Sequence, residues 1–278
     1  MALFISSISA NRMTRLLKAL SVGFVTVSLQ QPHISVTGRA GKIDVTAAQI
    51  TASVVENEVV AKGNALVQAP HLGITVSGST ISAQISRDAD AEPFLKRASV
   101  DGEALFKFAE LQAGGPVSAT AEFSANSLLY TGTERVGHLH IENRFRGVFR
   151  QPDDVYLITV EGGTADFDLF PGAPVSQDLM SSGEVSGPIK MSMKMRRTDS
   201  TVSLEGSADR ALMKLIGSDR TITLSGHVLI QGDGLGYVGN ASGQTAILSL
   251  GPKNELKDIK LLGSPAKAEA RPQGGGGS

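Results

Sequence analysis

Apolar and polar residues alternate along most of the chain after His33. Between Val59 and Ala69 the odd positions are apolar or small, whereas the even positions include Lys62 and Gln68. Because successive side chains of a β-strand point to opposite faces, this pattern predicts a half-buried strand with one apolar face. The same alternation predicts strands in residues 81–86, 189–196 and 222–230.

Turn-forming residues separate the predicted strands at short intervals. Within the first strand, Gly63-Asn64 predicts a bulge or a tight bend. Elsewhere, Gly162-Gly163 and Pro171-Gly172-Ala173-Pro174 predict turns. Many short strands separated by such turns indicate an antiparallel sandwich, roll or solenoid. The best helical pattern is Ala208–Leu215, which predicts a helical turn covering one end of the sheet.

A weak internal repeat accompanies this pattern. Residues 49–67 and 207–229 each contain an apolar segment, a short polar turn, an alternating strand and a glycine that leads to a second strand. Residues 122–141 form a looser third copy. A repeated strand-turn-strand unit indicates a stacked β-fold.

The composition narrows the classes of function. The 278 residues carry a formal net charge of −1 and contain 31 glycines, 5% aromatic residues and no cysteine. The near-neutral charge argues against a nucleic-acid-binding surface. The lack of cysteine excludes a disulfide scaffold, a zinc ribbon and a thiol nucleophile. Few aromatic residues with many glycines favour short strands over large helices.

The N-terminus predicts export. Arg12, Arg15 and Lys18 precede an apolar run over Ala19–Leu29, which is the order of a signal peptide. The run is too short for an ordinary membrane span. We therefore expect residues 1–31 to be a signal peptide or an N-terminal anchor, with a buried strand as the alternative. Residues 271–278 have the composition of a linker and are expected to be disordered.

Two stretches resemble a known family. They read ITASVVENEVVAKGNALVQAP from Ile50 and TITLSGHVLIQGDGLGYVGNASGQTAILSL from Thr221. Both are similar to the OstA-like domain, the family of the lipopolysaccharide-transport proteins LptA and LptC. The resemblance covers residues 42–86 and 202–268, whereas residues 90–200 differ from the family pattern. Residues 32–270 therefore form the expected β-region, with units near 32–90 and 200–270 and a divergent middle.

The resemblance implies a fold and a function. The fold is an antiparallel β-jelly-roll shaped like a folded sheet, with acyl chains held between its two faces. The implied function is non-enzymatic binding or transport of lipid or lipopolysaccharide in the periplasm or cell envelope. The implied partners are that lipid and other envelope proteins, or further copies of this chain, joined by strand pairing.

Alternation selects the residues that would contact lipid. Each predicted strand places its apolar side chains on one face, and stacked units would align these faces into a trough. The small residues Ala61 and Ala65 would leave space for a ligand. Met191 and Met193 would suit varied acyl chains, although flexible methionines also fill cores. The candidates are Val59, Ala61, Ala65, Val67, Met191, Met193, Ile222, Leu224, Val228 and Ile230.

Four cations are candidates for headgroup binding, because guanidinium and ammonium groups bind phosphates. Ordinary solvated strand faces are the alternative. The candidates are Arg144, Arg146, Lys190 and Lys194.

Other residues that could take part in catalysis or metal binding form no complete motif. His138, His140 and Glu142 have a spacing that could hold a metal on one strand face, but a solvated face is the favoured interpretation. Asp166 and Asp168 lack a paired acid–base partner in the sequence. The chain has no G-x-S-x-G and no H-E-x-x-H. We therefore predict no enzyme, no metal and no cofactor.

Three hypotheses remain open at this stage. The first is a lipid or lipopolysaccharide carrier. The second is a structural or adhesive β-protein of the envelope that binds no small molecule. The third is a metal-dependent β-roll enzyme that uses His138 and His140.

Overall fold

The computed structural model describes sixteen stretches of the chain, which are all β-structure with short connections. Every strand pairing is antiparallel, and the nineteen strands of the described residues belong to one sheet. The predicted all-β antiparallel fold class is confirmed. The described stretches are residues 4–5, 26–30, 32–38, 41–53, 56–70, 73–86, 95–111, 117–133, 136–150, 156–169, 180–196, 201–216, 219–234, 237–251, 256–263 and 265–272.

Eight long strands make up most of the sheet. They are β6 (Glu58–Ala69), β7 (Ile74–Ile85), β8 (Leu95–Leu111), β9 (Val117–Gly132), β14 (Met180–Arg196), β15 (Thr201–Ile216), β16 (Asp219–Gly234) and β17 (Tyr237–Leu250). The short strands are β1 (Phe4–Ile5), β2 (Thr26–Gln30), β3 (His33–Gly38), β4 (Gly41–Thr46), β5 (Gln49–Ser53), β10 (Gly137–Glu142), β11 (Phe145–Arg150), β12 (Tyr156–Gly162), β13 (Thr164–Leu169), β18 (Leu256–Leu262) and β19 (Lys267–Pro272).

The long strands bend near their middle, where the pairing register shifts. Gly63 and Asn64 have φ of 78° and 49°, and Gly226 and His227 have φ of 74° and 46°. Glycine adopts positive φ without steric cost, so it suits such a bulge. The bulge predicted at Gly63-Asn64 is confirmed. Register shifts occur at Lys62/Ala65, Ser77/Thr80, Asp101/Ala104, Ser186/Ile189, Ser207/Arg210 and Ser225/Val228.

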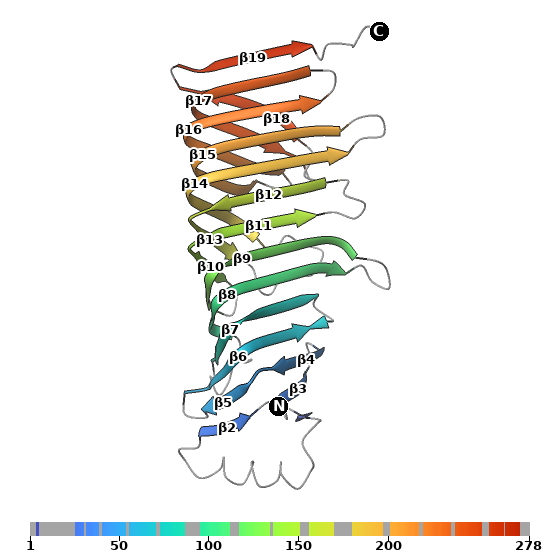
Figure 1. The fold of residues 1–278 in the computed structure, drawn as a ribbon, viewed down its shortest axis with the longest axis vertical. Helices are drawn as coiled ribbons and strands as arrows, with labels where there is room; N and C mark the ends of the chain where they lie inside the picture. The colour runs from blue at the N-terminus through green and yellow to red at the C-terminus, as the bar shows by residue number, and fades with distance from the viewer. Residues whose placement is uncertain are drawn as a thin grey trace.

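These bends fold the sheet along its long axis into two walls (Figure 1). Strand β9 shows the division, since residues 120–124 pair with β11 and residues 127–132 pair with β10. We call the half that contains β11, β12 and β19 wall A, and the half that contains β10, β13 and β18 wall B. The long strands contribute to both walls and join them at the bend.

The sheet continues through the described residues between 95 and 196, where the sequence differs from the family pattern. Strands β8 and β9 pair along most of their length, and β12 and β13 both pair with β14. The middle of the chain therefore belongs to the same folded sheet as its two ends.

The helical turn predicted at Ala208–Leu215 is wrong, because these residues lie in β15. Ala208 pairs with Ile189, and Ala211 pairs with Val185. Between Ala208 and Ala211 β15 advances three residues while β14 advances four, so that both alanines face the interior although they are three positions apart. A spacing of three residues is also expected on one face of a helix, which explains the wrong prediction.

Thr26–Gln30, within the segment expected to direct export, forms β2 and pairs with β5. The rest of that segment, apart from Phe4–Ile5, lies outside the described residues, as do residues 273–278 of the expected tail. Among the residues that the structure describes, no helix is long and apolar enough to span a membrane.

Candidate functional site

The interior between the walls is lined by rows of residues that lie in register from strand to strand. On wall B, the row next to the bend is apolar throughout. Alternation places these side chains on one face, and continuous pairing aligns them along the axis of the sheet. The row consists of Ile50, Ala61, Ile81, Val100, Leu128, Ile141, Ala165, Val185, Ala211, Leu224, Ala246 and Leu261.

A second row lies two residues farther from the bend on each wall. On wall A it consists of Val67, Val76, Phe106, Phe123, Gly147, Val160, Met191, Gly206, Ile230 and Ala241. On wall B it consists of Val59, Ala83, Ala98, Tyr130, Leu139, Phe167, Gly183, Met213, Ile222, Leu248 and Ile259.

The walls touch each other at the bend, which explains the small residues there. A Cβ atom added to Gly78 would lie 2.5 Å from Cγ1 of Val100, and one added to Gly162 would lie 2.5 Å from Cγ1 of Val185. Ala61 and Ala65 are each 2% exposed at this level. Their small size therefore allows close approach of the two walls next to the bend.

Four phenylalanines pack together at the middle of the interior. Phe106, Phe123 and Phe145 come from wall A, and Phe167 comes from wall B. The ring centroids of Phe123 and Phe167 are 5.4 Å apart, and those of Phe145 and Phe167 are 5.8 Å apart. Such offset and tilted pairs are favourable for aromatic rings. Sequence analysis missed this cluster, because the phenylalanines come from four strands far apart in the chain.

The predicted lipid-contact residues all face this interior. Those of the first unit lie on β6, and the others lie on β14 and β16, so the strands from β7 to β13 separate the two sets. Both sets belong to one continuous apolar cluster or pack against it, except Val59, which is 38% exposed. Met191 and Met193 are buried in that cluster.

The four predicted headgroup cations are exposed and lie outside this interior. Arg144 is at the bend, where its φ is 58°. On the outer face of wall A, Nε of Arg146 donates to Oε1 of Glu161 over 3.3 Å. Lys190 pairs in register with Glu161, and Lys194 lies farther from the bend on the same strand.

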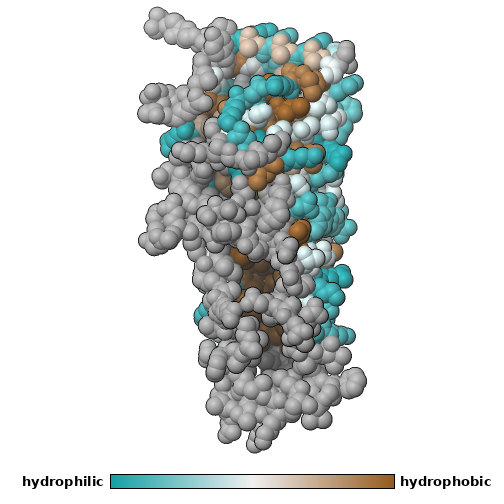
Figure 2. All heavy atoms as spheres, turned by 180° about the vertical axis from the view of Figure 1, so that it is seen from behind, coloured by the Kyte–Doolittle hydropathy of each residue, from teal (hydrophilic) through white to brown (hydrophobic). Residues whose placement is uncertain are grey.

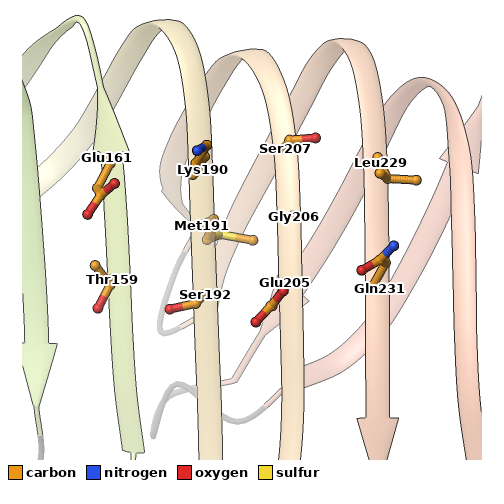
Figure 3. Close-up of a pocket in the computed structure, with 10 residues that line it drawn as sticks. All are labelled: Thr159, Glu161, Lys190, Met191, Ser192, Glu205, Gly206, Ser207, Leu229 and Gln231. Carbon is orange, nitrogen blue, oxygen red and sulfur yellow. The ribbon is translucent and has the colours of Figure 1, made fainter.

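An open depression of about 390 Å³ lies on the outer face of wall A, over β12 and β14–β16 (Figure 3). Short side chains such as Ser192 and Ser207 form its surface, and Glu161, Lys190 and Glu205 surround them. Because these charges are mixed in sign and lie on an open surface, they select no particular class of ligand.

His138 and His140 lie on the outer face of wall B opposite Asp168 and Asp166. Nδ1 of His140 is 2.7 Å from Oδ1 of Asp166, and the two ring nitrogens of His138 lie 3.1 and 3.2 Å from Asp166 and Asp168. Hydrogen bonds from Ser182 and His138 lower the pKa of Asp168. In the described part of the chain, no group of three or more such side chains has a geometry that could hold a metal.

No protein-family model matches the chain, and no curated protein matches it. Among solved structures, it is similar to that of LptH, the LptA homologous periplasmic component of the conserved lipopolysaccharide transport device from Pseudomonas aeruginosa. The identity is 14%, the match covers 49% of this chain and 88% of that chain, and the TM-score is 0.33. Because the two structures superpose poorly, the function has to be inferred from this chain's own residues.

Proposed function

We propose that this protein is a non-enzymatic lipid carrier that holds an acyl chain between wall A and wall B. The observation that carries the proposal is the exposure of Val59. This valine faces the interior and pairs with Ala83, yet it is 38% exposed, whereas Ala61 two positions closer to the bend is 2% exposed. At β6 the apolar interior is therefore open to solvent away from the bend.

Burial of an acyl chain in such an interior is favourable. Each methylene transferred from water to apolar surroundings contributes about 0.8 kcal/mol. A chain lying along the axis of the sheet would contact successive strands and cover their second-row side chains. The sequence resemblance to the OstA-like family supports lipopolysaccharide or a related glycolipid as the ligand, and the periplasm or cell envelope as its location.

The ends of the sheet support pairing with a partner. Among the described residues, β18 and β19 each pair only with β17, so each presents one backbone edge. An edge strand offers unpaired N–H and C=O groups to a further strand. We propose that another envelope protein or a second copy of this chain adds there by strand pairing.

Native mass spectrometry of protein purified from a Gram-negative host tests the carrier proposal. We expect a co-purifying lipid adduct, and competition between that adduct and added palmitic acid. A structural or adhesive protein would have no adduct and would not bind palmitic acid. That result would contradict the carrier proposal and favour the structural alternative.

A further inference from the structure

The two halves of the interior are filled to different extents. Between β14 and β17, burial reaches beyond the row next to the bend: Met191, Ile230 and Leu248 of the second row are 4%, 3% and 0% exposed. Farther from the bend, Met193 and Leu204 pair with each other and are also buried. The protein's own side chains therefore fill this half farther from the bend, while Met213, Ile222 and Ala241 of the second row are partly exposed.

Between β4 and β9, burial stops close to the bend. Among the described residues of these strands, every buried apolar side chain except Ala69 lies next to the bend, on wall A or on wall B. The second-row residues Val67, Val76, Ala83 and Ala98 are all partly exposed. Ile85 and Leu95, which pair with each other farther out on wall B, are 44% and 40% exposed.

The methionines of β14 account for part of the difference. The space between two walls that diverge from a bend widens with distance, so longer side chains are needed to fill it. Met191, Met193 and Met195 are long and flexible enough to do so. On β6 the residues at the levels of Met191 and Met193 are Val67 and Ala69, which are shorter. At the same levels of β7 and β8, Ile74, Phe106 and Phe108 are partly exposed. Protein interiors normally leave few voids, so unfilled apolar space of this kind suits a ligand.

The phenylalanine cluster lies at the boundary between the two halves. Phe106 and Phe123 stack at 6.1 Å on wall A, and Phe123 reaches Phe167 on wall B. On the N-terminal side of this contact burial stops close to the bend, and the strands on the C-terminal side have the buried methionines. The cluster therefore closes the unfilled half at one end.

A space-filling view supports this division. Figure 2 shows apolar residues in a hollow of the lower half of the molecule, at the height of β6–β9 in Figure 1. Hydrophilic residues border it on one side. The hollow is therefore an apolar recess in the half where burial stops close to the bend.

We propose that the acyl chain binds only in the N-terminal half of the interior, against Val67, Val76, Ala83 and Ala98, and that Phe106, Phe123 and Phe167 end its site. This inference rests on the proposed carrier function. It assigns the methionine-rich half, between β14 and β17, to stability of the fold.

Photo-crosslinking of the unaltered protein tests the location. The probe is palmitic acid with a diazirine in its alkyl chain, and mass spectrometry of the digested protein locates the attached residues. We expect crosslinks on β6, β7 and β8. Crosslinks on β14–β17 would overturn the inference while leaving the carrier function intact. Absence of any saturable crosslinking would contradict the carrier function itself.

Two matched substitutions test the same point by affinity for palmitic acid. Ala83→Leu adds three carbons to the unfilled half, and Ala241→Leu adds the same three to the second row of the filled half. We expect Ala83→Leu to weaken binding about tenfold, as for the loss of roughly two buried methylenes, with little change in Tm. We expect Ala241→Leu to keep the wild-type affinity and to lower Tm, because Ala241 packs against the buried cluster and a larger side chain would displace it.

The opposite pattern, or equal losses in both variants, would overturn the inference. If Ala241→Leu does not fold, Gly206→Ala replaces it, since an added Cβ there lies 3.5 Å from Cε of Met191 and 3.7 Å from Cδ1 of Leu224, ordinary contact distances. A loss of affinity in Gly206→Ala that matches that of Ala83→Leu would equally overturn the inference.

Discussion

Phe123 on β9 stacks on Phe167 of β13 across the interior, with ring centroids 5.4 Å apart. The two residues belong to different walls and are far apart in the chain, so their contact ties the walls together at mid-length. Both also contact Phe145 next to the bend. This relationship fixes the separation of the walls at the point where the less buried and the more buried halves of the interior meet.

Removal of one ring should therefore destabilise the whole sheet. We expect Phe167→Ala to lower the free energy of unfolding by about 3–5 kcal/mol, as for a fully truncated core aromatic residue. Urea unfolding measures this change. Leu229→Ala, on the outer face and 42% exposed, is the control and should stay within about 0.5 kcal/mol of wild type. Equal effects of the two substitutions would contradict the role of the cluster.

The bend depends on glycine at position 63. Gly63 has φ of 78°, and an added Cβ would lie 2.7 Å from Cβ of Ala48. We expect Gly63→Ala to lower the free energy of unfolding by about 1–2 kcal/mol because of the backbone conformation. The close contact with Ala48 should lower it further. Gly206→Ala, in an ordinary conformation, should be neutral or slightly stabilising. Thermal unfolding of both variants tests this contrast.

Asp44 should make the N-terminal end of wall A sensitive to acid. Hydrogen bonds from Ser35 and Lys42, and a weaker one from His33, lower the pKa of Asp44 from 3.8 to about 2. Since the folded-state pKa lies below the unfolded value, ionised Asp44 favours the folded state above pH 3.8, and this contribution is lost as the pH falls toward 2.

Urea midpoints measured between pH 5 and pH 2 test this dependence. Asp44→Asn carries no titrating group at this position, so its midpoint should fall less steeply with acid than that of wild type. Asp168, whose pKa is lowered by hydrogen bonds from Ser182 and His138, should contribute in the same direction. Parallel curves for wild type and Asp44→Asn would contradict the assignment.

Export remains a prediction from the basic residues and the apolar run at the N-terminus. Fusion of residues 1–40 to alkaline phosphatase, which is active only after export, should give phosphatase activity in Gram-negative cells. Replacement of Arg12, Arg15 and Lys18 by glutamate in the same fusion should reduce it, because a signal peptide needs a basic start. Retention of the unaltered fusion in the cytoplasm would contradict the prediction.

The sequence by itself determined which residues form strands and which face each side chain takes. Alternation over Val59–Ala69 and over Ile222–Ile230 gave both correctly, because a side chain's face follows from local backbone geometry. Gly63-Asn64 also correctly predicted the bulge in β6. The pattern failed at Ala208–Leu215, because β15 crosses the bend with three residues where β14 and β16 use four, which shifts the period of its inner face.

The tertiary structure decided what lies opposite each inner face. Alanine at positions 61 and 65 indicated ligand space in the sequence, but in the structure these residues lie where the walls meet. Met191 and Val67 occupy the same row, yet one is buried and the other is partly exposed. The separation between the walls decides this difference, and it depends on bends, register and aromatic contacts among strands far apart in the chain, which no local pattern records.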